Sequence, residues 1–284
     1  DSQLKEIKRS NIQIAEKIPT VPAWGPRVVK AMSLEAVFEH LSLNELFRLS
    51  WGAKNTHGAE WEKLKKDFEA RLVSMKRDAI QKGWLNPQAV YGYFPAQAAG
   101  NDLLVYDAST IKNANPKVLE VFNFPRQAGG ENLCLSDYFA SVDSGQMDVV
   151  AFQVVTVGNE ATERFDKLQA NADYTEAYFS HGLSVQTAEA TADYLHNHIR
   201  RELGLGKEQG QRYSWGYPAI PELNDHQKVF RLLPVETELN MGLTSAFQLV
   251  PEQSTAAIIL HHPLAKYFNV GVNRLEQLMK VQAK

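Results

Sequence analysis

Residues 212–221, R-Y-S-W-G-Y-P-A-I-P, concentrate residue types that suit a small charged ligand. Arg212 presents a planar fork of hydrogen-bond donors that matches a carboxylate. Three aromatic rings offer flat faces to a purine or a positive centre: Tyr213, Trp215 and Tyr217. The run therefore fits a ligand that combines a carboxylate, an aromatic base and a cation. By composition alone, an aromatic-rich core loop fits it as well.

The backbone of this run is also unusual. Gly216 has no Cβ and lets the chain approach a ligand closely. Pro218 and Pro221 each remove a backbone donor, so the run is a poor helix and an unlikely central strand. We expect the two prolines to hold the segment extended.

A second candidate is Glu189, in a long helix predicted over residues 174–203. It follows Val185 by four residues and precedes Ala192 by three, which places it at the edge of the apolar helix face. A carboxylate at that position usually has a partner. A salt bridge at the rim of the core and a contact with a ligand are equal alternatives.

The remaining reactive side chains favour structural roles. Cys134 lies between apolar residues and is expected to be a buried small hydrophobe. His261 and His262 follow each other at the end of a strand, so their rings should lie on opposite faces and cannot chelate one ion. A hydrolase built on these three residues would need a base beside the thiol, which the sequence does not indicate. We expect no metal bound by this chain.

Composition excludes several classes of function. The chain has 284 residues, of which 44% are hydrophobic and 22% charged, as in ordinary globular proteins. Its net charge of −3 argues against a nucleic-acid partner. With no apolar run of about 18 residues, no membrane partner is expected. A single cysteine favours a reducing, cytoplasmic setting.

Hydrophobic periodicity predicts the elements that must position these residues. Helices are expected after the N-cap Ser33 and over residues 43–49, 59–81, 160–171, 174–203 and 273–281. Strands are expected over residues 89–94, 102–107, 118–124, 148–158, 245–249 and 256–261, the first two forming a hairpin and the fourth being central. The proline-rich residues 18–27 are expected to be extended and irregular. Strands grouped in hairpins between long helices predict an α+β fold in one domain.

Several blocks of this sequence resemble the activation domain of cobalamin-dependent methionine synthase. Residues 212–221 match its R-x-x-x-G-Y-P-A-x-P motif. The other similar blocks are L-N-P-Q-A-V-Y-G-Y-F-P-A-Q (85–97), G-N-D-L-L-V-Y (100–106), L-C-L-S-D-Y-F (133–139), A-E-A-T-A-D-Y-L-H (188–196) and H-H-P-L-A-K-Y-F (261–268). They occur in the family's order over about residues 20–270.

The resemblance implies a fold and a function. The fold is a single C-shaped α+β domain around a twisted antiparallel sheet flanked by long helices. The function is to bind S-adenosylmethionine and to remethylate oxidised cob(II)alamin with an electron from flavodoxin or a related reductase. The cobalamin is carried by a partner module, and zinc belongs only to the homocysteine module of the parent enzyme. Residues 1–26 would be the lead-in from the cobalamin module, and 27–284 the activation domain.

Roles for single residues also follow from the resemblance. Arg212 would bind the ligand's carboxylate, and Tyr217 would stand at the face that meets cobalamin. Other residues would contact the ligand: Tyr213, Ser214, Trp215, Gly216, Glu189, Tyr267, Phe268 and Ser42. Ser42 stands where the family has an aspartate that contacts the ligand's amino group, and Asn44 or Glu45 could substitute for that aspartate.

The resemblance covers one module of the enzyme. The chain lacks the D-x-H-x-x-G signature of the cobalamin module and a cysteine-rich zinc site. Because it begins at Asp1, we expect a piece of the large enzyme. The alternative is a free-standing module that senses S-adenosylmethionine or covers cobalamin without transferring methyl groups.

Overall fold

The computed structural model describes residues 9–271, and its centre is an antiparallel sheet with strand order β4-β3-β2-β5-β9-β6. β1 also pairs with β2, along the part of the edge that β3 leaves open. The strands of the sheet are β1 (Gly25–Val29), β2 (Gln88–Ala99), β3 (Asp102–Tyr106), β4 (Val118–Asn123), β5 (Asp148–Thr156), β6 (Gln211–Ser214) and β9 (Ser254–Leu260). β7 (Gly242–Leu243) and β8 (Leu249–Val250) form a separate small hairpin.

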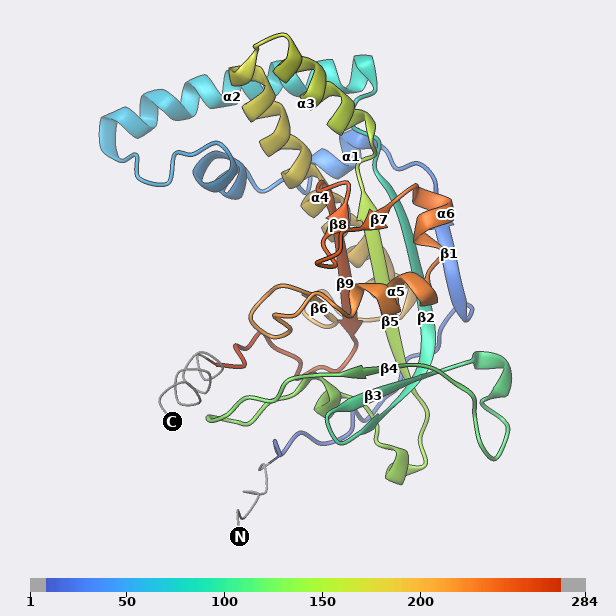
Figure 1. Ribbon diagram of the computed structural model, residues 1–284. Helices are drawn as coiled ribbons and strands as arrows, with labels where there is room; N and C mark the ends of the chain where they lie inside the picture. Colours follow the sequence, from blue (N-terminus) through green and yellow to red (C-terminus); the bar gives the residue numbers. More distant parts are fainter. Residues whose placement is uncertain (1–8, 272–284) are drawn as a thin grey trace, which may run out of the picture.

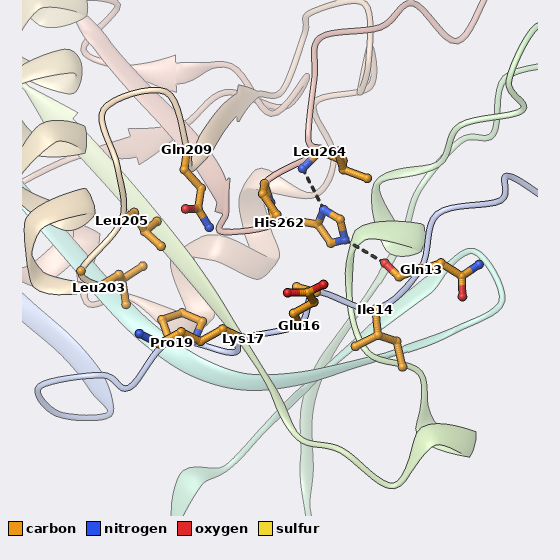
Figure 2. Close-up of a pocket in the computed structure, with 13 residues that line it drawn as sticks. Gln13, Ile14, Glu16, Lys17, Pro19, Leu203, Leu205, Gln209, His262 and Leu264 are labelled. Atoms are coloured by element: carbon orange, nitrogen blue, oxygen red, sulfur yellow. Dashed lines mark hydrogen bonds between the residues drawn. The ribbon is translucent and has the colours of Figure 1, made fainter.

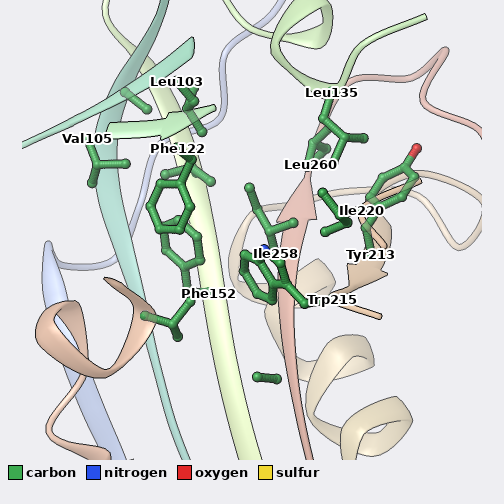
Figure 3. Packing of buried hydrophobic residues seen from close by; sticks show 14 of the residues in the cluster. Leu103, Val105, Phe122, Leu135, Phe152, Tyr213, Trp215, Ile220, Ile258 and Leu260 are labelled. Atoms are coloured by element: carbon green, nitrogen blue, oxygen red, sulfur yellow. The ribbon is translucent and has the colours of Figure 1, made fainter. Parts of the chain in front are cut away.

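The central strands are apolar on both faces because both faces are covered. All nine residues of β5 are buried, as expected for a strand with helices or loops on each side. On one face, Phe152 of β5 stacks with Phe122 of β4, and Trp215 and Ile258 complete the main core (Figure 3). On the other face, alternate residues of β2 and β5 pack against a long helix.

That helix is α4 (Tyr174–Glu202). Small residues such as Ala192 let its backbone lie close to the sheet, and Leu195 and Ile199 fill the space beside them. The other helices are α1 (Leu34–Phe38), the π-helix η1 (Glu45–Ser50), α2 (Gly58–Lys82), α3 (Glu160–Ala170), α5 (His226–Leu232) and α6 (Val235–Leu239). Short 3₁₀ turns are η2 (Ala108–Thr110), η3 (Leu135–Tyr138) and η4 (Val142–Ser144).

The molecule has the outline of a C. In Figure 1, the sheet and α4 form its back, α2 and α3 extend from one end, and β3 and β4 extend from the other end to the same side. The predicted fold class, an α+β domain with an antiparallel sheet flanked by long helices, is confirmed. Within residues 9–271, no helix combines the length and the apolar character needed to cross a membrane.

Most predicted elements are present, with three differences. Residues 245–249 do not form a strand: Ser245 and Ala246 make the turn between β7 and β8, and β8 begins only at Leu249. The last residues of the proline-rich lead-in, from Gly25, already belong to β1 because their backbone pairs with β2. The helix predicted over residues 43–49 is the π-helix η1. The helix predicted over residues 273–281 lies outside the described residues.

Candidate functional site

A cavity of about 520 Å³ lies at the edge of the sheet, between β6, α4 and the segment that follows β9. β6 is an edge strand that pairs only with β9 among the described strands, with Arg212 opposite Ile259. The lining residues are Glu189, Arg212, Tyr213, Ser214, Tyr217, Pro218, Ala219, Tyr267, Phe268 and Asn269. The structure thus brings together seven of the residues expected to contact a ligand or cobalamin, from three separate parts of the chain.

Arg212 brings a buried hydrogen-bond donor without a partner to the cavity. Its Nη1 atom is buried, and no residue between 9 and 271 provides a hydrogen-bond partner for it. A buried donor without a partner costs about 1–3 kcal/mol, and more when it is charged. A carboxylate from outside the chain would remove that cost, because the guanidinium fork matches a carboxylate in two bonds.

Glu189 supplies negative charge beside this arginine. Burial raises the pKa of the Glu189 carboxyl, the positive charge of Arg212 acts in the opposite direction, and Glu45 raises the pKa further. Glu45 begins η1, which packs against α4, so a second carboxylate lies within electrostatic range of the cavity. Two carboxylates that repel each other near an open cavity favour a cation between them.

Tyr217 stands on a turn that Gly216 makes possible. Gly216 has φ +87°, a conformation that glycine adopts without strain. Its N–H donates to the carbonyl of Ile220 over 2.8 Å, and the N–H of Ile220 donates back to Tyr217 over 3.0 Å. This turn leaves the Tyr217 side chain 56% exposed at the cavity mouth. The charge of Glu189, with burial as the second cause, raises the pKa of the Tyr217 hydroxyl.

The far wall consists of aromatic side chains held by β6. The hydroxyl of Tyr213 donates to the carbonyl of Lys266 over 2.7 Å. Its ring lies 5.6 Å from that of Tyr267, nearly edge to face, and 6.3 Å from that of Phe268. The N–H of Val270 donates to Pro218, which joins this wall to the turn. The wall is therefore fixed from both ends, and Tyr267 remains 69% exposed.

Comparison with known proteins identifies the family. The model of the family described as "Vitamin B12 dependent methionine synthase, activation domain" matches residues 26–284. The chain belongs to this family.

Relatives and a solved structure agree with this assignment. The activation domain is 34% identical to methionine synthase of Mycobacterium tuberculosis and 31% identical to that of Mycobacterium leprae, over 93% of this chain in each case. It spans 24% of the length of these relatives. The structure described as "Crystal Structure of the MetH Reactivation Domain bound to AdoHcy" superimposes with a TM-score of 0.77 at 27% identity, over 94% of this chain and 88% of that chain.

Three of the expected contact residues of this activation domain do not line the cavity. The indole of Trp215 is buried in the main core, stacked on Phe152, so it offers no face to a ligand there. β6 ends at Ser214, and Trp215 lies in the turn that follows, with its side chain in the main core. Gly216 shapes the turn instead of lining the cavity. The prolines do not hold the segment extended, because turns follow at residues 215–216 and 218–219.

Ser42 is the third. Its hydroxyl accepts a hydrogen bond from the backbone N–H of Glu45 over 3.3 Å and so caps η1. The neighbouring charge that acts on the cavity is that of Glu45, which raises the pKa of both Glu189 and Tyr217. Of the two substitutes considered for the missing aspartate, Glu45 is therefore the one with an electrostatic link to the site.

Further residues of the activation domain, not expected to contact a ligand, lie at or near the cavity. Pro218 and Ala219 line the cavity from within the same motif, so the motif itself was the signal for them. Asn269 gave no such signal. His196 lies seven residues after Glu189 on the same face of α4, and the positive charge of Arg212 contributes to lowering its pKa. Burial lowers the pKa of His196 to about 4, so its imidazole is neutral beside the site at neutral pH.

The remaining candidates of the activation domain have structural roles. Cys134 is fully buried, as predicted, and burial raises the pKa of its thiol, so it is not a ready nucleophile. His261 pairs with the buried carboxylate of Asp148 over 2.5 Å. In the described residues, no three His, Cys, Asp or Glu side chains converge as metal ligands would.

Proposed function

We propose that this chain binds S-adenosylmethionine in the cavity at β6 and provides its methyl group to cobalamin, as the activation domain of a cobalamin-dependent methionine synthase. The observation that carries the proposal is the buried, unpartnered Nη1 of Arg212 in a cavity that also contains a carboxylate and aromatic walls. The related reactivation domain was crystallised with AdoHcy, the demethylated product of this ligand.

The parts of the ligand match the groups of the cavity. Arg212 would take the carboxylate through its free guanidinium nitrogen. Glu189, with Glu45 nearby, would attract the ammonium and the sulfonium, both of which carry positive charge. Tyr267 and Phe268 offer ring faces to the adenine and to the sulfonium. Ser42 stays a prediction that rests on the resemblance to the family.

The cavity is open, which suits the chemistry. We infer that cob(II)alamin carried by another module meets the open side, where Tyr217 is exposed. Cobalamin reduced with one electron from flavodoxin or a related reductase would supply the nucleophile for the methyl group. The residues of this cavity would hold the sulfonium during the transfer and would retain S-adenosylhomocysteine afterwards. A sealed pocket would prevent this approach.

The setting of the chain follows from the same proposal. Residues 1–26 would lead in from the cobalamin module, residues 27–284 would form the activation domain, and zinc would belong to the homocysteine module of the whole enzyme. A reducing cytoplasm suits a chain whose one cysteine is buried and unpaired.

Calorimetric titration with three ligands tests the proposal. S-adenosylmethionine and S-adenosylhomocysteine should bind saturably to the chain. Methylthioadenosine has the same nucleoside and sulfur but lacks the amino acid part, so it should bind at least about tenfold more weakly if Arg212 reads the carboxylate. Equal affinity for all three ligands would show that Arg212 does not bind the carboxylate. If none of the three binds, the proposal is overturned.

A further inference from the structure

Residues 9–19, which precede the family match and the first strand, lie on the surface of the domain as a docked segment that we call the strap. At one end, Arg9 and Ser10 both donate to the buried carboxylate of Asp137, over 3.0 and 2.6 Å. Further along, Ala15 is 7% exposed, and Ile18 packs against the core beneath α4. The strap thus makes specific contacts along its length.

The middle of the strap is held by one histidine. The backbone N–H of Leu264 donates to Nδ1 of His262 over 3.0 Å. Nδ1 is therefore unprotonated, and the proton of the neutral ring is on Nε2, which donates to the carbonyl of Gln13 over 2.9 Å. Figure 2 shows His262 between these two partners. The ring thus joins the strap to the chain segment that follows β9.

Beside this bond the strap is loosely packed. A cavity of about 480 Å³ separates its residues from Leu203 and Leu205, which follow α4 (Figure 2). An element with a cavity along one side loses part of the dispersion energy of close packing. The strap can therefore detach at a lower cost than a strand of the sheet, and its end contacts and His262 determine whether it stays in place.

The segment that His262 begins ends at the ligand cavity. The N–H of Ala265 donates to the carbonyl of His262 over 3.1 Å and closes a turn. After this turn, the carbonyl of Lys266 accepts a hydrogen bond from the hydroxyl of Tyr213. The two residues that follow, Tyr267 and Phe268, line the cavity. The seven residues 262–268 therefore connect the strap to the aromatic wall.

We propose that docking of the strap and binding of ligand in the β6 cavity stabilise each other through residues 262–268. The inference rests on the proposed function, because it needs a ligand for the cavity. A docked strap fixes His262 and with it the wall that the ligand contacts. A bound ligand fixes the same wall and with it the histidine that holds the strap. Because linkage is reciprocal, the two effects must be equal in size.

The first measurement is hydrogen exchange of strap amides in the unaltered chain, with and without saturating S-adenosylhomocysteine. No strap residue lines the ligand cavity, so slower exchange over residues 12–18 is expected only if the two are coupled. The second is the affinity for the same ligand in a double variant, Arg9→Ala with Ser10→Ala, which weakens the strap at the end that contacts Asp137. We expect about fivefold weaker binding, the lower range of ordinary coupling.

Arg231→Ala is the matched control. Its side chain is 54% exposed and pairs with Glu120, as that of Arg9 is 52% exposed and pairs with Asp137, but it lies outside the strap. It should bind S-adenosylhomocysteine as the unaltered chain does. If S-adenosylhomocysteine binds but the hydrogen exchange of the strap amides does not change, the coupling is overturned and the proposed function is not. No binding to the unaltered chain would overturn the proposed function and the coupling with it.

If the double variant fails to fold, the hydrogen-exchange measurement on the unaltered chain still tests the coupling. His262→Ala then tests the link from its other end. It should accelerate exchange over residues 12–18 and abolish the response of these amides to the ligand. A response that persists without His262 would overturn its role in the link.

Discussion

Arg212 and Glu189 line one cavity from two different elements, yet Nη1 of Arg212 has no hydrogen-bond partner within residues 9–271. Arg212 opposes the rise that burial causes in the pKa of Glu189, so the two charges interact at a distance. An arginine that formed a bidentate salt bridge with this glutamate would have few donors left for a ligand. Because the two side chains do not form a salt bridge, both charges stay available to a ligand. The buried Nη1 without a partner reduces the stability of the chain when no ligand is bound.

Arg212→Ala should weaken binding of S-adenosylhomocysteine by about 1.5–3 kcal/mol, the usual value for a hydrogen bond to a charged group. Arg212→Lys should recover only part of this loss, because an ammonium cannot make two parallel bonds to a carboxylate. Calorimetry measures both. Arg201→Ala removes an exposed arginine of α4 and serves as control. An unchanged affinity in Arg212→Ala would rule out its assigned role.

Glu189→Gln should affect stability and binding in opposite directions. Burial raises the pKa of Glu189 in the folded state, so the folded chain binds its proton more tightly than the unfolded chain. Stability therefore decreases as pH rises through the folded pKa, and the ionised carboxylate is a cost at pH 7. The neutral amide should raise Tm while weakening S-adenosylmethionine binding. A lower Tm would mean that Glu189 is a structural ion-pair partner.

Glu189 also predicts how binding depends on pH. Because its pKa is raised, its charge is lost at a higher pH than for an ordinary glutamate, whose pKa is about 4.3. The preference for S-adenosylmethionine over S-adenosylhomocysteine should therefore decrease on acidification, since only the former carries a sulfonium. Paired titrations from pH 8 to pH 5 measure this ratio. In Glu189→Gln, the ratio should no longer change with pH.

Glu45→Gln tests the substitute for the aspartate that Ser42 replaces. If Glu45 attracts the ammonium group, the variant should lose about 0.5–1.5 kcal/mol of S-adenosylmethionine affinity, less than Arg212→Ala, because Glu45 is exposed. Glu35→Gln is the control, at the equivalent first turn of α1. If Ser42→Ala alone weakens binding, the serine itself contacts the ligand.

Tyr217→Phe should separate binding from methyl transfer. The side chain is 56% exposed at the cavity mouth, so loss of its hydroxyl should leave S-adenosylhomocysteine affinity within about twofold. Reactivation, followed as conversion of cob(II)alamin to methylcobalamin with the cobalamin module and a reductase present, should slow by about tenfold or more if the hydroxyl orients that face. A large loss of affinity would instead place Tyr217 against the ligand.

His196 predicts acid sensitivity of the fold. Burial lowers its pKa from 6.5 to about 4 in the folded state, so the unfolded chain binds more protons between these pH values. Stability should therefore decrease as pH falls through this window, by about 3 kcal/mol for this one group. Chemical denaturation from pH 7 to pH 4 measures it. His196→Gln can keep the bond to the Gly210 carbonyl and should flatten the profile, whereas the exposed His57→Gln should not.

The sequence predicted the fold well where hydrophobic periodicity is strong. β5 is mostly apolar and α4 has a regular small-residue face, and both were placed within one or two residues of their ends. The hairpin of β7 and β8 was misplaced because its strands have two residues each, too few to show a period. Pairing of β1 with β2 could not be read from proline-rich residues, since it depends on a partner distant in sequence.

The site divides in the same way. Residue types and the family motif indicated Arg212 and Tyr217, and the structure places both at the cavity. Their roles stay predictions. The ring of Trp215 was expected to face a ligand, but composition does not tell a ligand-facing ring from a core ring, and here the ring is part of the core. The contribution of Glu45 depends on how η1 packs against α4, which only the three-dimensional structure reveals.

The strand that carries Arg212 has a consequence for synthesis on the ribosome. β6 is held in the sheet by β9, which is translated later, and β9 in turn completes the edge of β5. The aromatic wall follows β9 in the chain as well. A nascent chain that ends before β9, at residue 253 or earlier, can thus form the hairpin of β2 and β3 and pair it with β5, but it lacks the strand that pairs with β6 and Arg212. The ligand cavity is therefore assembled last, and a chain truncated near its end loses the site before it loses the sheet.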